Sequence, residues 1–197
     1  MNRSRHRPAN VIRAVYSKTT IRVYQAYSHE IAESALRHGT FVSPPFKMGR
    51  MTWIKPSFLW MMYRAGWGFK DPGQARILAI DISREGFGWA LAHSTASQPD
   101  PHLPQADWHR LKGERPVRIQ WDPERDLLFR PQAQRCIQIG LSRQAVEHYV
   151  HDWIRSITDI TPLAHATHDL VTLGQLAAAG ALLPREQLYP CTPDDAW

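Results

Sequence analysis

The sequence predicts a single α+β domain with a mixed, largely antiparallel sheet and flanking helices. The chain has 197 residues and 43% apolar content, which suits one core of ordinary size and is short for two. Predicted strands outnumber the helices that could join parallel neighbours, so most strand pairs should be antiparallel. We expect a flexible basic N-terminal arm over residues 1–12 and one domain over residues 13–197.

Three strand-to-helix units account for the first half of the chain. Each combines a run of β-branched, aromatic or aliphatic residues with a serine or proline suited to a helix start. The strands are expected at 20–28, 51–54 and 76–82, and the helices after Ser28, at Pro56 and after Ser83. Gly39 and Gly66 are placed to end the first two helices.

Two further strands are predicted after a proline-rich surface loop over 94–107. The first is 116–121, and the second is 135–141, where Cys136 lies in an apolar run. Their connection begins with Asp-Pro, which predicts a turn directly after the first strand.

The remaining chain is predicted to be helical. Apolar residues at helical spacing predict a long helix over 142–157, with Tyr149, Val150 and Trp153 in the core. A last helical region is expected over 162–183, interrupted at Gly174.

The charge of the chain favours an anionic partner. The formal net charge is +6 and the sequence pI is near 9.6, as expected for a protein that meets a polyanion or an anionic small ligand. Part of the excess lies in the arginines of the N-terminal arm, which a solvated tail explains equally well. With two cysteines and no apolar run that could span a bilayer, we expect a cytoplasmic protein without a membrane partner.

Missing motifs exclude several classes of site. The sequence has no GxGxxG after a strand, no Walker loop, no GxSxG elbow and no HExxH. No Cys/His spacing suits zinc, and His165 and His168 would need ligands from elsewhere, so no metal site is predicted.

The first predicted strand carries polar and aromatic side chains. Alternation places Arg22 and Tyr24 on one face and Gln25 and Tyr27 on the other. An inward arginine would need a partner, and an anionic ligand would supply one. A solvent-facing arginine in a surface ion pair is the simpler alternative, and the strand alone leaves both open.

The tryptophan-rich segment 51–70 predicts an anion site. Lys55 and Ser57 lie at a strand-to-helix junction, where free backbone N–H groups favour an anion. Trp53 and Trp60 are candidates for stacking on a base or a nicotinamide ring. Their apolar neighbours Phe58, Met61 and Met62 have the spacing of core residues.

Gln138 lies between Ile137 and Ile139 in the late strand. If the two isoleucines face the core, the amide faces the other side, which is either solvent or a cleft where it bonds a sugar hydroxyl. The charged group in 122–126 is more simply interpreted as a turn with internal ion pairs.

Five stretches of the sequence, taken together, resemble those of a known protein family. The stretches are IRVYQAYS, RMTWIKPSFLWMMYRAGWG, ILAIDISREGFGWALAHS, PVRIQWDPERD and IQIGLS. They resemble a family of bacterial and fungal proteins labelled a domain of unknown function. The resemblance runs from about Arg13 to about Leu188. More remotely, the order of elements is similar to that of ADP-ribosyltransferases, which bind NAD in a cleft between two small sheets.

The remote resemblance implies an NAD-dependent ADP-ribosyltransferase, with DNA, RNA or a nucleobase as a candidate acceptor. It implies that Arg22 holds the phosphate or ribose of NAD, that Tyr24 or Trp53 stacks on nicotinamide, and that Gln138 matches the late-strand position. Together with the anion site predicted at Lys55 and Ser57, we therefore expect NAD to be bound by Arg22, Trp53, Lys55 and Ser57, with Gln138 and Tyr24 as the catalytic residues. Many of these transferases have glutamate where this chain has Gln138, so the amide adds no charge to stabilise an oxocarbenium-like transition state. A non-catalytic module that binds nucleic acid or senses a nucleotide is the alternative function.

Overall fold

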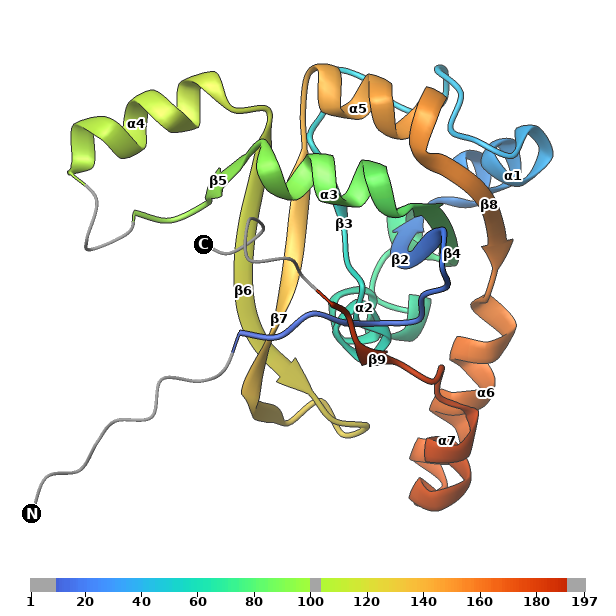
Figure 1. The fold of residues 1–197 in the computed structure, drawn as a ribbon. Coiled ribbons are helices and arrows are strands. Elements are labelled where there is room, and N and C mark those ends of the chain that lie inside the picture. The colour runs from blue at the N-terminus through green and yellow to red at the C-terminus, as the bar shows by residue number, and fades with distance from the viewer. Residues whose placement is uncertain (1–9, 100–103, 191–197) are drawn as a thin grey trace, which may run out of the picture.

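The structure is a computed structural model that describes residues 10–99 and 104–190. It confirms the predicted α+β class with mostly antiparallel strands (Figure 1). A three-stranded sheet has the order β2-β4-β8, with bounds Thr20–Tyr27, Arg76–Ser83 and Ile154–Asp159. A four-stranded sheet has the order β3-β7-β6-β5, with bounds Thr52–Ile54, Pro131–Leu141, Val117–Arg125 and Ser94–Ala96. A short third sheet pairs β1 (Arg13–Ala14) with β9 (Gln187–Leu188), and β5 with β6 is the parallel pair among the named strands of the described chain.

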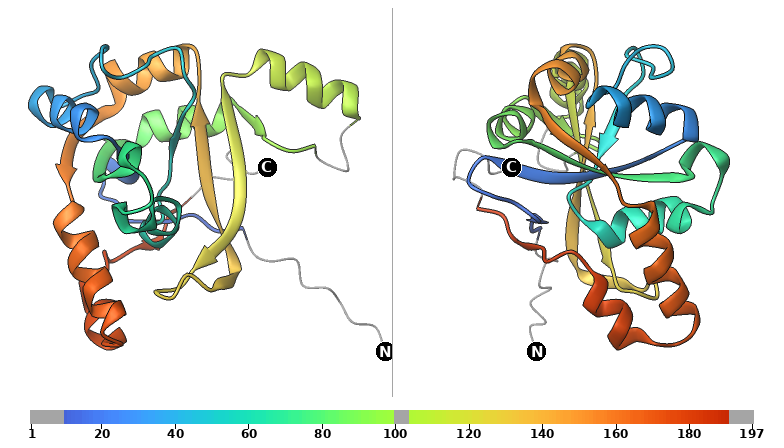
Figure 2. Two further views of the ribbon diagram at one scale, coloured as in Figure 1. Left: turned by 180° about the vertical axis from the view of Figure 1, so that it is seen from behind. Right: turned by 90° about the vertical axis from the view of Figure 1, so that its right-hand side faces the viewer.

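Helices cover both faces of the β2-β4-β8 sheet (Figure 2). One face is covered by α1 (His29–His38), α3 (Arg84–Ala92) and α5 (Gln144–His148), and the other by α2 (Phe58–Ala65) and α6 (Thr161–Thr172). The other helices are α4 (Gln105–Glu114), α7 (Leu176–Leu182), a π-helical turn at Tyr149–Trp153 and 3₁₀ turns at Gly66–Gly68 and Pro72–Gln74.

Serine caps begin three of these helices, as the sequence predicts at two of them. Ser28 and Ser83 accept hydrogen bonds from the backbone N–H groups of Ile31 and Gly86. At α2 the cap is Ser57, one residue after the proline that was predicted to begin the helix. Positive φ angles at Gly39 and Gly66 end α1 and α2, as glycine allows without steric strain.

Buried apolar side chains form two clusters, one on each face of the three-stranded sheet. The larger cluster lies between the two main sheets and includes Val23, Ile80, Ile139 and Trp153. The smaller cluster includes Ile77 and contacts from α2 and α6. Because β4 is buried on both faces, its sequence is a continuous apolar run and not an alternating one.

The predicted helix over 142–157 is wrong after residue 153. Residues 154–159 form β8, an edge strand paired antiparallel with β4. Ile154 and Ile157 pack against the core from this strand, as they would from a helix. The apolar pattern therefore did not distinguish a strand from a helix here. The predicted core positions of Tyr149, Val150 and Trp153 are confirmed.

The late hairpin is longer than predicted. Residues 122–125 continue β6, and the turn follows at 126–130, so the charged group was wrongly interpreted as a turn over most of its length. The Asp-Pro signal was misleading because Pro123 lies at a register irregularity in the β6–β7 ladder. The expected loop over 94–107 also contains β5 and the start of α4.

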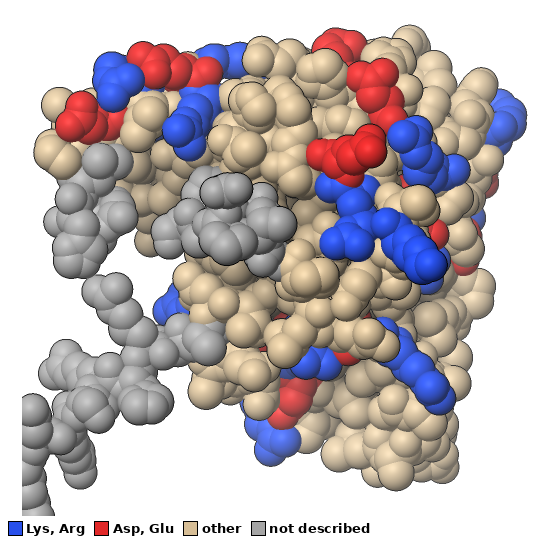
Figure 3. Space-filling model, viewed as in Figure 1, with Lys and Arg blue, Asp and Glu red and all other residues tan. Residues whose placement is uncertain are grey.

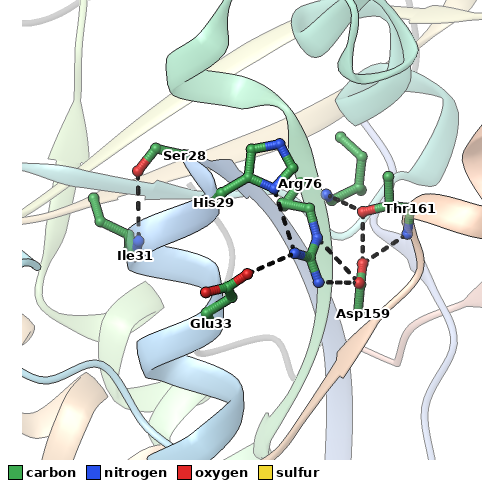
Figure 4. A network of polar contacts seen from close by, with 8 residues as sticks. Ser28, His29, Ile31, Glu33, Arg76, Asp159 and Thr161 are labelled. Carbon is green, nitrogen blue, oxygen red and sulfur yellow. Dashed lines mark hydrogen bonds and ion pairs between the residues drawn. The ribbon is translucent and has the colours of Figure 1, made fainter.

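A polar network joins β4, β8 and α1 at one end of the three-stranded sheet (Figure 4). The Arg76 guanidinium donates to Asp159 and lies 3.8 Å from Glu33. Asp159 also accepts hydrogen bonds from the backbone and side chain of Thr161, and therefore caps α6 from outside the helix. This network fixes the ends of both strands but lies apart from the cavity described below.

Residues 1–9 of the predicted N-terminal arm lie outside the described residues. The last part of that segment contacts the fold. The Val11 backbone N–H donates to Arg135 over 3.2 Å, and Ile12 accepts from the backbone of Tyr189 over 2.8 Å. None of the helices within 10–99 and 104–190 combines the length and apolar character needed to span a bilayer.

Candidate functional site

A cavity of about 460 Å³ opens between α2 and the strands β3, β6 and β7. This volume lies within the range of small-ligand pockets. We call it the first cavity, and its lining side chains are aromatic, cationic or hydrogen-bonding: Trp53, Lys55, Trp60, Tyr63, Arg64, Gln120, Asp122, Arg125 and Gln138. Three of the predicted site residues, Trp53, Lys55 and Gln138, therefore share one cavity.

The backbone of β3 connects the two main sheets at the cavity wall. The Tyr24 N–H of β2 donates to the Lys55 carbonyl over 2.8 Å. The buried Gln25 amide donates to the hydroxyl of Thr52 and to the carbonyl of Trp53, over 2.7 and 3.1 Å. The Tyr149 hydroxyl donates to the side-chain oxygen Oε1 of Gln25 over 2.7 Å. These contacts fix the position of the strand from which Trp53 and Lys55 project.

The Trp53 ring lies against the backbone of β7. A Cβ atom added at Gly140 would lie 2.9 Å from the ring, so glycine is required for this approach. Gly140 is also the cross-strand partner of Trp53 in the β3–β7 ladder. Because strand and ring are both held, Trp53 forms a rigid aromatic wall with little rotational freedom to lose when a ligand stacks on it.

Lys55 is a buried amine without a carboxylate partner at ion-pair distance in the described chain. Its residue is 7% exposed, and its Nζ donates to the Trp53 carbonyl over 3.2 Å. Burial, together with the Arg64 charge, lowers the pKa of this amine to about 7, and Asp122 acts in the opposite direction. Near neutral pH the amine is therefore poised between a cation and a neutral base.

Asp122 is held by two amides on the opposite wall of the cavity. Gln120 donates to its Oδ1 over 3.0 Å, and Gln138 donates to its Oδ2 over 2.5 Å. Residues Gln120 and Gln138 are cross-strand partners, and Asp122 lies two residues along β6 on the same face. The carboxylate makes no ion pair within the described residues, so it keeps acceptor capacity toward the cavity.

Cationic and aromatic side chains form the third wall. The Arg125 guanidinium lies over the ring of Tyr63 at 4.0 Å and over the ring of Trp60 at 5.4 Å. The Trp60 indole N–H and the Arg125 Nε have no hydrogen-bond partner among the described residues. Arg64, from the last turn of α2, completes this wall at the solvent side.

Ser57 does not line the first cavity. Its hydroxyl accepts a hydrogen bond from the Trp60 backbone and donates to Glu124 Oε1 over 2.9 Å. The serine is buried and joins the start of α2 to β6. In this position it supports the wall that carries Trp60.

Arg22 belongs to β2 and does not line the first cavity. It pairs with Asp81 of β4, its cross-strand partner, through two hydrogen bonds of 2.9 Å. This is the ion-pair alternative left open by the sequence. The pairing holds the pKa of the Asp81 carboxyl below its usual range.

Tyr24 also lies outside the cavity, in the smaller cluster. It is fully buried and its ring contacts Phe58 edge to face at 5.6 Å. Burial raises the pKa of its phenol well above the usual value. Phe58, Met61 and Met62 are buried as well, which confirms their prediction as core residues.

The cavity contains charged residues that the sequence interpretation did not assign to a site. These are Arg64, Asp122 and Arg125. One signal was present: Gln120 lies in the predicted strand 116–121 and Asp122 lies two residues further on, so an extension of that strand would place both on one face. Finding their partner required the register of β6 against β7, which the Asp-Pro pair obscured.

The arrangement has the parts needed to bind a nucleotide. Aromatic faces suit a base, guanidinium groups suit phosphate, and a carboxylate with two amides suits ribose hydroxyls. No group of three or more His, Cys, Asp or Glu residues that could hold a metal occurs in the described part of the chain. His165 and His168 pack around Phe69, at 4.4 and 5.2 Å between ring centres.

Comparison with known protein families gave a match over nearly the same residues as the fold described above. The chain matches one family over residues 11–189, and the family is described as a domain of unknown function, DUF4291. The match covers most of the chain, so the chain belongs to this family. A comparison with curated proteins gave no match.

Proposed function

We propose that this member of the DUF4291 family binds NAD through the first cavity and transfers its ADP-ribose group to an acceptor. The observation that carries the proposal is the composition of the cavity. One space of about 460 Å³ combines three aromatic rings, three cations and a carboxylate held by two amides. NAD offers a flat cationic ring, a pyrophosphate and ribose hydroxyls to those three kinds of group.

The aromatic and cationic walls account for binding. Trp53 offers a rigid ring on which nicotinamide stacks, and Arg64 and Arg125 offset the charge of the pyrophosphate. Both arginines are without ion pairs in the described chain, so phosphate does not have to displace a protein carboxylate. Arg22 has no part in this account, because it is already paired with Asp81 outside the cavity.

Asp122 supplies the negative charge that Gln138 lacks. When the bond from ribose to nicotinamide lengthens, positive charge develops on the ribose carbon, and a carboxylate beside it lowers the barrier. Gln138 donates to Asp122, which keeps the carboxylate in place, while its own carbonyl oxygen remains for a ribose hydroxyl. In this proposal Asp122 supplies the negative charge that glutamate supplies in many ADP-ribosyltransferases at the late-strand position, where this chain has Gln138.

The test is nicotinamide release from NAD by the wild type and by Asp122→Asn. We expect the variant to bind NAD within a fewfold of the wild type and to lose about 10²-fold or more in kcat, since the charge acts mainly in the transition state. Asp126→Asn is the matched control, because Asp126 lies in the turn and pairs with Arg130 outside the cavity. It should leave both quantities unchanged.

Two results would contradict the proposal. Absence of NAD binding by the wild type would remove it altogether. NAD binding without nicotinamide release would favour the alternative, a module that senses a nucleotide without turnover. That alternative uses the same aromatic and cationic walls and needs no role for Asp122.

A further inference from the structure

A second cavity of about 630 Å³ adjoins the first. The two cavities share Trp53, Lys55 and Arg64 in their linings, so these three side chains form a common wall. The rest of the second cavity comes from the end of β2, the start of α1 and the segments 46–52 and 71–74. It therefore belongs to different elements from those that carry Asp122 and Gln138.

The rim of the second cavity is cationic. Lys47, Arg50 and Arg64 line it, all three residues are exposed, and none forms an ion pair with another described residue. Asp71 is the acidic residue in its lining, and its neighbour Gln74 donates to that carboxylate over 2.5 Å. Unpaired cations around a hollow with an aromatic wall are suited to a phosphate-bearing nucleotide.

Resting on the proposed function, we infer that the second cavity is the acceptor site. It takes a nucleotide through its phosphate, and Lys55 in the common wall accepts the proton of the acceptor hydroxyl. A free mononucleotide and the terminal nucleotide of a single strand present the same phosphate and ribose, so either can be the source of the acceptor.

The step is balanced without a further reagent. The acceptor oxygen forms a bond to the ribose carbon of NAD as the bond from that carbon to the nicotinamide nitrogen breaks. Nicotinamide leaves as a neutral molecule with the bonding electron pair, and the hydroxyl proton passes to the neutral Lys55 amine. Water in place of the acceptor gives ADP-ribose by the same route.

The position of Lys55 supports this role over a purely electrostatic one. Lys55 is in the lining of both cavities, whereas Arg125 lines the first and Arg50 the second. The charged groups around it are Arg64 and Arg125 from α2 and β6, Asp122 from β6, and Lys47, Arg50 and Asp71 at the second cavity. With a pKa of about 7, the amine is neutral often enough near physiological pH to take a proton.

The first experiment separates the two cavities. Uridine 5′-monophosphate and a single-stranded uridine oligonucleotide serve as acceptors, and transfer of ADP-ribose is followed by mass spectrometry. The double variant Lys47→Ala/Arg50→Ala should bind NAD within about twofold of the wild type and lose at least about tenfold in transfer to the better acceptor. Lys112→Ala, on α4 beside Trp108, removes a lysine that lines neither cavity and is the control, which should change neither quantity.

Three outcomes would overturn the inference. Unchanged transfer by the double variant would show that the acceptor does not use this cavity. An equal loss of NAD affinity would show that NAD itself extends into it. If the wild type does not bind NAD, direct titration with uridine 5′-monophosphate still tests the site, and equal affinity in wild type and double variant would then refute it.

The second experiment tests the proton transfer. Transfer by the wild type should rise with pH and level off above about 7, following deprotonation of Lys55. Lys55→Arg keeps a cation in the wall but supplies no base, so it should retain NAD binding within a fewfold and lose this pH dependence together with most of the transfer rate. Full transfer by Lys55→Arg with the wild-type pH profile would exclude Lys55 as the base.

Discussion

Lys55 is the residue whose chemistry is changed most by the fold. In water a lysine amine is protonated at neutral pH, but here burial opposes the charge and the cation of Arg64 adds to this effect. The described chain places Asp122 near enough to act electrostatically without forming an ion pair. The same features that make the amine reactive must therefore reduce the stability of the folded state at neutral pH.

Because the folded state disfavours the protonated Lys55 amine, the free energy of unfolding should depend on pH. The pKa of Lys55 is about 7 when folded and 10.5 as a free side chain, so between these values the unfolded chain binds more protons. The free energy of unfolding of the wild type relative to Lys55→Met should then rise by about 1.4 kcal/mol per pH unit from about pH 7 to 10. Denaturant unfolding of both proteins measures the difference, and a flat difference would show that the amine is well solvated.

Three of the residues that the sequence suggested for a site, Trp53, Lys55 and Gln138, line one cavity. They could be named from the sequence because local patterns predict the strands and the strand-to-helix junction that carry them. Arg22 and Tyr24 were assigned by the same alternation, but their surroundings depend on β4 and α2, which local patterns do not specify. An arginine on a strand is equally compatible with a ligand and with a cross-strand aspartate.

Among the elements, α3 shows how a helix is fixed by one close contact. A Cβ atom at Gly86 would lie 2.3 Å from Cγ of the buried Trp153 ring, whereas one at Gly88 would meet nothing within 4 Å. Both glycines lie in the same helix. They therefore form a matched pair for testing how tightly α3 packs on the π-helical turn.

We predict opposite effects for alanine at these two positions. Gly86→Ala should lower the free energy of unfolding by about 1–3 kcal/mol, because the indole ring cannot move without disturbing the core. Gly88→Ala should raise it by about 0.5–1 kcal/mol, as alanine favours an open helical position. Thermal or denaturant unfolding decides between these signs, and similar values for both variants would contradict the packing of Trp153.

The element α2 is held at its start by a residue from the far end of the chain. The Phe58 backbone N–H donates to Glu186 Oε1 over 2.7 Å, next to the Ser57 cap. Burial raises the pKa of this carboxyl to about 8, with Glu124 contributing in the same direction. The segment that leads into β9 is thus attached to the helix that forms a wall of the first cavity.

The contribution of this carboxyl to stability should fall as pH rises, because burial disfavours its charged form. The folded state keeps the Glu186 proton up to about pH 8, whereas the usual pKa is 4.5, so the folded chain binds more protons in between. The free energy of unfolding of the wild type relative to Glu186→Gln should fall by about 1.4 kcal/mol per pH unit from about pH 5 to 8. An unchanged difference across this range, measured by denaturant unfolding, would place the carboxyl in water.

For the molecule as a whole, local sequence patterns predict the fold class but not how the strands are arranged in sheets. The α+β class followed from composition and from the order of elements, but the division into two sheets depends on pairs far apart in sequence. Tyr24 with Lys55, and Asp122 with Gln138, are brought together by those pairings. The cavity is a product of the arrangement of the sheets, and no single segment of the sequence contains it.

Charge is also distributed at the scale of the molecule. The net charge is +6, yet the face seen in Figure 3 is mostly uncharged, with Lys and Arg close to Asp and Glu. On this face an anionic ligand would meet particular groups of cations and not a uniform basic surface. In the described chain, such groups line the two adjoining cavities.

Calorimetric titration of NAD into three proteins tests whether NAD binds in the first cavity. We expect the wild type and Arg22→Ala to bind NAD equally well, because Arg22 is paired with Asp81 outside the cavity. Arg125→Ala should bind about 10–100-fold more weakly, as expected for loss of a charged contact worth about 1.5–3 kcal/mol. Absence of binding by the wild type, or loss of binding by Arg22→Ala but not by Arg125→Ala, would contradict the account.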